Sequence, residues 1–203
     1  MTPLPPVAAR NRKVEQGEVT RAALVAVARD LFAERGFAGT ATEEIVQRAN
    51  VTRGALYHHF SGKDDLFRAV FESLEAEIAD RVVTAAARAR DPLAQITAGL
   101  DAFLDSCLEP AVQRIVLLEG PSVLGWETWH EIDTQYAFGL TLAALQGGID
   151  SGVIKKQPVE PLTHLVVGAI VQAGLVVARA ENPARARKEM RTAFGHILDG
   201  LRA

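Results

Sequence analysis

A short stretch of the chain, residues 51 to 63, concentrates side chains that can donate hydrogen bonds to anions and to base edges. Leu56 and Phe60 lie four residues apart, which places both on one side of a helix, facing a core. The opposite side then carries Arg, Tyr and His, which suit phosphate oxygens, as do the free amides of a helix N-terminus. We therefore predict a nucleic-acid contact, made by Thr40, Thr52, Arg53, Gly54, Ala55, Tyr57, His58, His59 and Lys63.

Short helices and tight turns must position these residues. Thr40 to Glu43 fits a capping box, in which the Thr40 hydroxyl accepts a hydrogen bond from the Glu43 amide, so a short helix is expected to begin there. Asn50 tolerates the left-handed backbone of a tight turn. Thr52 is then the expected N-cap of the next helix. Together with the helix that precedes them, these elements predict a helix-turn-helix, whose third helix enters the major groove of DNA.

Composition agrees with a globular protein. The 203 residues are 48% hydrophobic and 23% charged, which is enough apolar material for a core. The formal net charge of −3 shows no overall attraction to nucleic acid, but Arg10, Arg12 and Lys13 form a basic cluster near the N-terminus. A single cysteine, Cys107, excludes an internal disulfide, and the first residues contain no apolar run typical of a signal peptide. A cytoplasmic protein is expected.

One predicted helix near the C-terminus is unusually apolar, because residues 162–178 contain no charged side chain. We do not interpret it as a membrane span, since it is short for that purpose and His164 and Gln172 interrupt it. A helix that is apolar on nearly every side needs cover on nearly every side, and a second copy of the chain would supply it. The expected dimer interface comprises Leu165, Ile170, Val177, Phe194 and Ile197, with Gly168 and Gly174 allowing close approach.

The middle of the chain is rich in aromatic residues, which either line a ligand pocket or form ordinary core. The expected pocket residues are Phe103, Cys107, Trp126, Trp129, His130, Asp133 and Tyr136, with Asp101, Asp105 and Gln135 as further polar anchors. His130 and Asp133 lie one helical turn apart, a spacing that metal ligands also use. Without a cluster of cysteines or histidines, we predict neither a metal nor a cofactor.

The stretch from about Thr20 to Phe71 resembles the TetR family of transcriptional regulators. The residues that carry this resemblance are Leu31-Phe32, Gly36-Phe37, Thr40, Ile45, Ala49, Val51, Arg53-Gly54, Leu56-Tyr57, His59-Phe60, Lys63 and Leu66. The resemblance implies an N-terminal three-helix DNA-binding domain, a linking helix, a larger ligand-sensing domain and a dimer built from the last two long helices. Asn50 stands where the family usually has Gly. Ala55 stands where many members have Thr or Ser, which leaves contact with a thymine methyl group as one option.

We therefore expect an all-α protein of about nine helices in three parts. These are a flexible basic arm (1–16), a helix-turn-helix domain (17–77) and a ligand-sensing and dimerisation domain (78–203). The expected function is a homodimeric repressor that a small apolar or amphipathic ligand releases from a pseudo-palindromic operator. The alternatives are a small all-α enzyme using His130 and Asp133, and a DNA-binding dimer without ligand response. An enzyme is not expected, because the sequence contains no readable pair of nucleophile and base.

Overall fold

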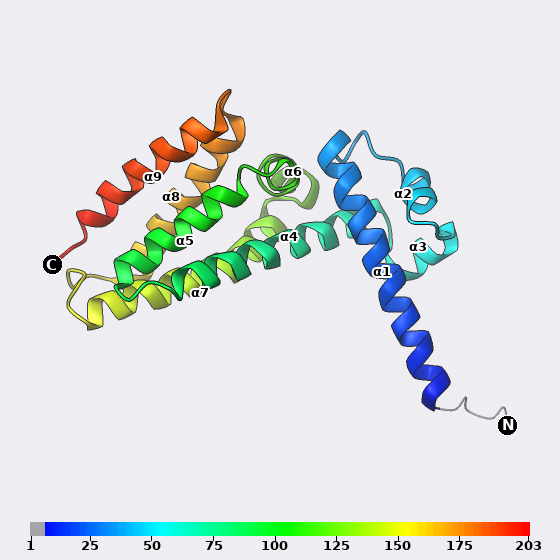
Figure 1. The fold of residues 1–203 in the computed structure, drawn as a ribbon, viewed down its shortest axis with the longest axis horizontal. Helices are drawn as coiled ribbons and strands as arrows, with labels where there is room; N and C mark the ends of the chain where they lie inside the picture. Colours follow the sequence, from blue (N-terminus) through cyan, green and yellow to red (C-terminus); the bar gives the residue numbers. More distant parts are fainter. Residues whose placement is uncertain (1–6) are drawn as a thin grey trace. The chain divides into compact units, whose positions relative to one another are not determined.

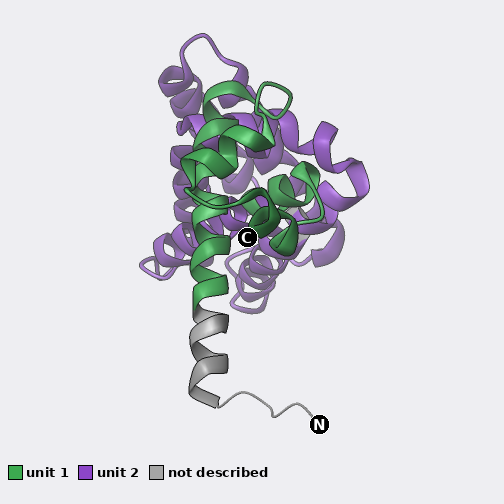
Figure 2. Ribbon diagram, turned by 90° about the vertical axis from the view of Figure 1, so that its right-hand side faces the viewer, with its two compact units in different colours: residues 1–70 green, residues 71–203 purple. Residues whose placement is uncertain are grey.

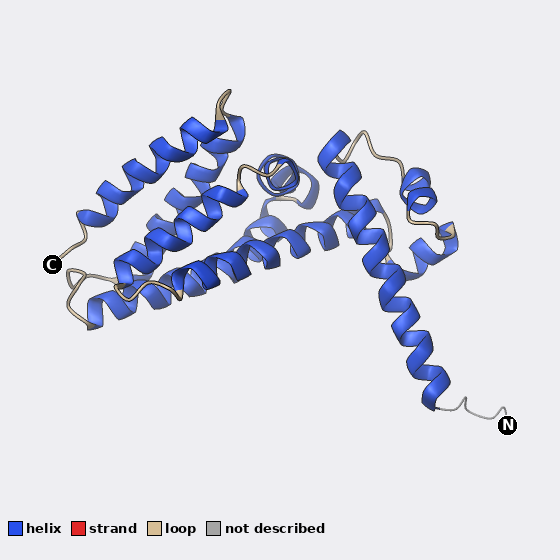
Figure 3. Ribbon diagram, viewed as in Figure 1, coloured by secondary structure: helices blue, strands red, loops and turns tan. Residues whose placement is uncertain are grey.

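The computed structural model describes the backbone of residues 7–203 and the side chains of residues 16–203 other than 133 and 134. Figure 3 shows helices joined by short loops, without a strand in the described part of the chain, so the all-α prediction is confirmed. The elements, labelled in Figure 1, are α1 (Val7–Arg35), α2 (Thr42–Arg48), α3 (Arg53–His59), α4 (Lys63–Ala86), α5 (Pro92–Ser106), η1 (Val112–Glu119), α6 (Gly120–Leu124), α7 (Trp126–Asp150), α8 (Val159–Arg179) and α9 (Pro183–Asp199).

The chain forms two compact units, Met1–Val70 and Phe71–Ala203, coloured separately in Figure 2. The division falls inside α4, as does the expected domain limit after residue 77. A single continuous helix therefore contributes residues to both units.

The first helix reaches into the range 1–16, where we expected a flexible arm. Its first residue is Val7, so the described part of that range is helical. The sequence accounts for this difference, because no proline follows Pro6 until Pro92 and residues 8–16 include several strong helix formers. Residues 1–6, with Pro3 and Pro5, lie outside the described residues.

Aromatic and aliphatic side chains fill the core of the first unit. The rings of Phe32, Phe37 and Phe67 meet with centroids 5.2 to 5.9 Å apart. Leu56 is fully buried and Phe60 is 3% exposed, as the four-residue spacing predicts. These two side chains fix which face of α3 lies against α1 and α2, and therefore which face is left outward.

The second unit is a bundle in which α8 is central. This helix packs against α7, α9, α5 and η1. It is the one helix in the described chain long and apolar enough to cross a membrane, with a mean hydropathy of 1.8 over a window that is 39% buried. Packing against four elements gives these apolar residues a role within the bundle.

Between α5 and α7 the chain forms two helical elements in succession. The segment Val112–Glu119 is a π-helix, and α6 follows it directly. Gly120 and Pro121 are a loop signal in the sequence, yet they begin α6, because a proline in the first helical turn gives up no intrahelical hydrogen bond. This pair of elements brings the described total to ten, where about nine were expected.

Candidate nucleic-acid interface and ligand cavity

The turn between α2 and α3 has the geometry that its sequence predicts. Asn50 has φ of 53° and is the one non-glycine residue with positive φ in the described part of the chain. The Thr52 hydroxyl accepts a hydrogen bond from the Ala55 amide at 3.1 Å, so Thr52 is the N-cap of α3. Both predictions about this turn are confirmed, and together they set the direction in which α3 leaves the turn.

The outward face of α3 carries most of the residues predicted to contact DNA. Arg53, Gly54, Tyr57 and His58 are exposed, with Tyr57 retaining 46% of its accessible surface, and Ala55 is half-buried. The structure thus gathers a cationic, an aromatic and an imidazole donor on one two-turn helix.

His59 lies at the edge of this face. It is half-buried, its ring centroid is 5.2 Å from that of His58, and a Cβ placed on Gly17 would lie 3.7 Å from its Cε1 atom. His59 therefore lies against α1 as well as beside the outward face of α3.

An exposed cluster of three side chains joins α2 to α3. Glu43 Oε1 lies 3.3 Å from Arg53 Nη1, and the Arg53 guanidinium carbon lies 5.5 Å from the centre of the Tyr57 ring. The pKa of Glu43 is lowered, first by a hydrogen bond from its own backbone amide, then by Thr42 and by the charge of Arg53. The pKa of Arg53 is raised, first by hydrogen bonding with Tyr57 and then by nearby charge that includes Glu43. Both groups remain ionised at neutral pH.

Sequence reasoning assigned Glu43 only to a capping box, and the structure corrects that prediction. α2 begins at Thr42 with Ala41 as its N-cap, and no side chain caps it. The Glu43 side chain can reach α3 because its expected donor, the Thr40 amide, donates to the Phe37 carbonyl at 3.3 Å instead. The signal in the sequence that could have predicted this ion pair was a glutamate on one helix of the motif and an arginine at the start of the next.

Two of the predicted DNA contacts, Thr40 and Lys63, are used within the chain. Thr40 is 1% exposed, and its hydroxyl donates to the Gly36 carbonyl at 2.8 Å. The Lys63 ammonium donates to the carbonyls of Phe37 and Thr40 at 2.8 and 3.0 Å and lies over the Phe37 ring. Both side chains therefore hold the loop between α1 and α2, a role that spacing along the sequence does not reveal.

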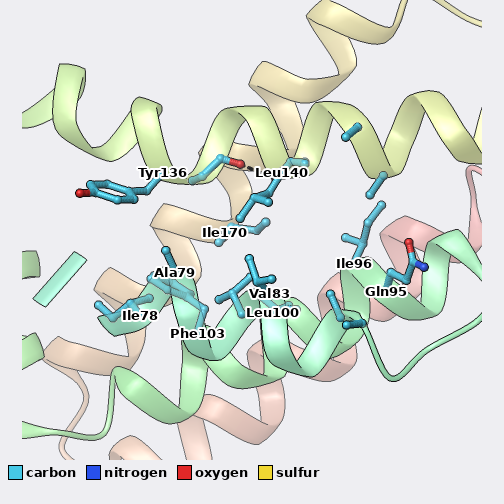
Figure 4. Close-up of a pocket in the computed structure, with 18 of the residues that line it drawn as sticks. Ile78, Ala79, Val83, Gln95, Ile96, Leu100, Phe103, Tyr136, Leu140 and Ile170 are labelled. Carbon is cyan, nitrogen blue, oxygen red and sulfur yellow. Dashed lines mark hydrogen bonds between the residues drawn. The ribbon is translucent and has the colours of Figure 1, made fainter. Parts of the chain in front are cut away.

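A cavity of about 400 Å³ lies within the second unit, between α4, α5, α7 and α8. Figure 4 shows aliphatic side chains from these helices gathered around it together with Phe103, and Tyr136 at its edge. The polar exceptions among its described lining residues are Glu75, Gln95, Thr141 and the Tyr136 hydroxyl. Glu75, on α4, is 6% exposed. The cavity can therefore take an apolar molecule and offers it a buried carboxylate at one point.

Two family models match separate parts of the chain. Residues 24–70 match the bacterial regulatory proteins of the tetR family, and residues 93–201 match the tetracyclin repressor-like C-terminal domain. The chain belongs to the TetR family. Its members are DNA-binding transcriptional regulators rather than enzymes, so this chain is a regulator, and the alternative of an enzyme using His130 and Asp133 is abandoned.

Individual relatives agree with this assignment. A crystal structure of a TetR-family transcriptional regulator from Pectobacterium atrosepticum shares 32% identity and a TM-score of 0.83, covering 93% of this chain and 97% of that one. The transposon Tn10 TetC protein of Escherichia coli is 26% identical over 159 residues, which is 78% of this chain and 80% of the relative. The transcriptional regulator AcrR of Shigella flexneri is 36% identical over 110 residues, 54% of this chain and 51% of that protein.

In this TetR-family chain the cavity contains fewer of the predicted pocket residues than expected. Phe103 and Tyr136 line it. Trp129 is buried, but it is not among the described residues that line the cavity, and its indole N–H donates to the Val116 carbonyl. Trp126 is 65% exposed and stacks on His130, which is also exposed. None of these three side chains is among the described residues that line this cavity. The side chain of Asp133 lies outside the described residues.

Cys107 is buried but is likewise absent from the described cavity lining. The pKa of its thiol is raised to about 12, first by burial and then by the negative charge of Glu75. Cys107 is therefore a neutral core residue.

The predicted polar anchors are also outside the cavity. Arg187 on α9 lies 2.8 Å from Asp105 and 3.5 Å from Asp101, and Arg191 lies 3.4 Å from Asp101. These ion pairs tie α5 to α9, while Gln135 is exposed. Within the described residues, no group of three or more His, Cys, Asp or Glu side chains could hold a metal ion.

The residues predicted to form the dimer interface divide into two sets. Leu165 and Ile197 are 73% and 56% exposed, whereas Val177 and Phe194 are 0% and 3% exposed. Val177 and Phe194 therefore belong to the core of a single protomer, and Ile170 lines the cavity. These differences share one cause: one side of α8 packs against helices of its own protomer and is therefore not accessible to a second copy.

The two glycines of α8 are also not equivalent. A Cβ on Gly174 would lie 2.8 Å from Phe103 and 3.2 Å from the Cys107 sulfur, whereas one on Gly168 would meet no atom within 4 Å. Gly174 thus accommodates α5 of its own protomer.

Proposed function

We propose that this regulator represses transcription by binding a pseudo-palindromic operator as a homodimer, and that an amphipathic small molecule releases it. In this proposal α3 of each protomer enters the major groove, with Arg53, Tyr57 and His58 facing DNA. Two such helices must be spaced by about 34–36 Å, one turn of B-DNA, to read both half-sites. A bacterial-type regulator that binds operator DNA is proposed to be located in the cytoplasm.

The observation that carries the sensing half of the proposal is that α4 has two roles. Its first turns complete the core of the DNA-binding unit through Leu66 and Phe67, and its later turns line the cavity through Glu75 and Ile78. A ligand that prefers one position of α4 changes the geometry of the recognition helices in the dimer. Such a ligand weakens DNA binding only to the extent of its preference for the non-binding conformation.

The cavity wall indicates the chemistry of the ligand. Aliphatic residues favour an apolar body, because its burial removes apolar surface from water. The carboxylate of Glu75 can accept several hydrogen bonds, so it can receive a ligand donor beside the contacts it already makes. We therefore propose an amphipathic ligand with an apolar body and a hydrogen-bond donor, such as an amine, directed toward Glu75.

The dimer is proposed to form through the exposed apolar residues of α8 and α9. Leu165, Val176 and Ile197 all retain more than a third of their accessible surface. Large apolar side chains left exposed in this way are typical of interaction surfaces when they gather on adjacent elements. α8 and α9 pack against each other, so these side chains belong to adjacent helices.

The test is a ligand screen combined with operator binding. A panel of hydrophobic amines and neutral analogues is titrated while tryptophan emission and affinity for a selected DNA duplex are followed. Phe103→Ala should weaken ligand binding and leave DNA affinity unchanged. Phe138→Ala is a matched control, because Phe138 packs on His164 and is not among the described cavity lining.

The outcomes separate the two halves of the proposal. A panel that changes neither tryptophan emission nor DNA affinity would favour a DNA-binding dimer without ligand response. A ligand response without any DNA affinity would instead contradict the operator-binding half.

A further inference from the structure

The ion pair between Glu43 and Arg53 lies on the face that we propose contacts DNA. Both side chains are largely exposed, at 65% and 67%, and an exposed pair of this kind contributes little to stability. The same two groups are nevertheless held by further contacts. The Thr42 hydroxyl donates to Glu43 Oε2 at 3.2 Å, and Tyr57 lies beneath the guanidinium of Arg53. These contacts restrict the orientation of the Arg53 side chain and contribute little to the stability of the fold.

The guanidinium retains unused donors while it is paired. A guanidinium has five N–H donors in a rigid plane, and the ion pair engages only the Nη1 side. A bidentate contact with guanine requires two adjacent donors aimed at O6 and N7. Glu43 on one side and the Tyr57 ring on its face restrict the rotation of the Arg53 fork without occupying all of its donors.

The charge of Glu43 has a second consequence at this position. A carboxylate close to DNA is repelled by phosphates, so it weakens binding to every sequence. It also opposes movement of Arg53 toward a backbone phosphate, because such movement separates the ion pair. A phosphate contact would carry no sequence information, whereas a base contact does.

We infer that Glu43 is a positioning residue that holds Arg53 in the orientation needed to read a guanine in each half-site. This inference rests on the proposed DNA contact of α3. It adds that specificity at this base depends on an acidic residue of α2, which does not itself touch the base.

The test compares base preference with overall affinity. Wild-type and variant proteins are subjected to binding-site selection from a randomised duplex library, and affinities are then measured for the selected and for unrelated duplexes. Glu43→Gln should reduce the preference at one base pair of each half-site by roughly tenfold. It should at the same time raise affinity for unrelated DNA, because a negative charge has been removed. Arg53→Ala should lose the same preference but lower the affinity for unrelated DNA.

Two controls make the result specific. Glu44→Gln removes the same charge from the neighbouring position of α2, where Glu44 pairs with Arg35 and Arg48 instead, and it should leave the base preference unchanged. Arg53→Lys retains the charge but not the planar fork, so it should lose the preference as Arg53→Ala does. In the double variant, Glu43→Gln should have no further effect on base preference once Arg53 is alanine.

The outcomes distinguish this inference from the proposal beneath it. If Arg53→Ala leaves the selected sequence unchanged, the proposed DNA contact of Arg53 is wrong. If Arg53→Ala changes the sequence and Glu43→Gln does not, only the positioning role is wrong. An increase in affinity for all duplexes by the same factor, with unchanged preference, would show that Glu43 acts through its charge alone.

Discussion

The α3 face and the cavity of the second unit place their functional side chains in opposite environments. On α3, charged and aromatic groups are exposed and restrained by one another, as with Arg53 between Glu43 and Tyr57. Around the cavity, aliphatic groups from four helices surround a space that Glu75 alone supplies with formal charge among its described lining residues. The first region suits a polyanion, and the second suits an apolar molecule.

This difference means that the two proposed binding events depend on different physical forces. Binding at the α3 face depends on charge in water, where salt screens it. Binding in the cavity depends mainly on removal of apolar surface from water. Conditions that weaken one interaction should therefore leave the other nearly intact.

The largest expected effect is that of salt on DNA binding. If the dimer contacts about six to ten phosphates, its DNA affinity should fall by about 10³–10⁵ between 50 and 200 mM salt. Ligand affinity should change little over the same range. Fluorescence anisotropy with a labelled duplex, beside a ligand titration of the same preparation, measures both. A flat DNA response would contradict the electrostatic character of the α3 face.

A second prediction separates buried from exposed apolar residues on α8. Val177→Asp should lower the free energy of unfolding by several kcal/mol, because it places an unpaired carboxylate at a fully buried position. Leu165→Asp, at a position 73% exposed, should leave the unfolding of the protomer unchanged and convert the dimer to monomers. Urea denaturation and sedimentation together test both. A dimeric Leu165→Asp variant would place the interface elsewhere.

A third prediction concerns lysines that bind carbonyl groups in the two units. Lys63→Ala should cost about 1–3 kcal/mol of stability, because it removes a charged donor from the carbonyls of Phe37 and Thr40. Base preference should not change. Lys155→Ala is the matched variant in the second unit, where one longer bond to the Gly200 carbonyl is lost, and its effect should be smaller. Equal costs would contradict the role of Lys63 in holding the loop.

The smallest expected effect is the alkaline response of Cys107. Its pKa is about 12 when folded and 9.0 for the unperturbed group, so between these values the unfolded chain loses its proton first. Stability from the neutral thiol is therefore full below pH 9 and declines as pH rises from 9 toward 12. Near pH 10 the decline should be about 1 kcal/mol. Urea denaturation of Cys107→Ala should show a shallower fall over this range, and an identical slope would contradict burial of the thiol.

Local patterns predicted the first unit well. Asn50, Thr52 and the pair Leu56 and Phe60 act through partners a few residues away, and such partners can be recognised from spacing alone. The structural role of Lys63 was not predicted, because its acceptors, the carbonyls of Phe37 and Thr40, lie more than twenty residues earlier in a loop. A lysine that sequence spacing places at a DNA-binding face can thus also bind carbonyl groups within the fold.

For the second unit, the sequence predicted the helices but not how they pack against one another. Pro92 and Pro183 lie in the first turns of α5 and α9, where proline is compatible with a helix start. The rotation of α8 about its axis could not be predicted, because apolar residues surround the helix and no stripe indicates which side is inward. Val177 was consequently assigned to the dimer interface rather than to the core, and the position of Ile170 in the cavity wall was not predicted. Packing between helices, rather than pattern along one helix, decides such positions.

Gly174 does not line the cavity but lies against Phe103, which does. A substitution at Gly174 in a descendant of this gene could therefore change ligand preference. A methyl group there would come within 2.8 Å of Phe103, so the Phe103 ring would have to move. Since that ring lines the cavity, a single codon change outside the binding site would alter the shape of the site itself. A change in the shape of the cavity can therefore arise by substitution at a residue that does not itself line it.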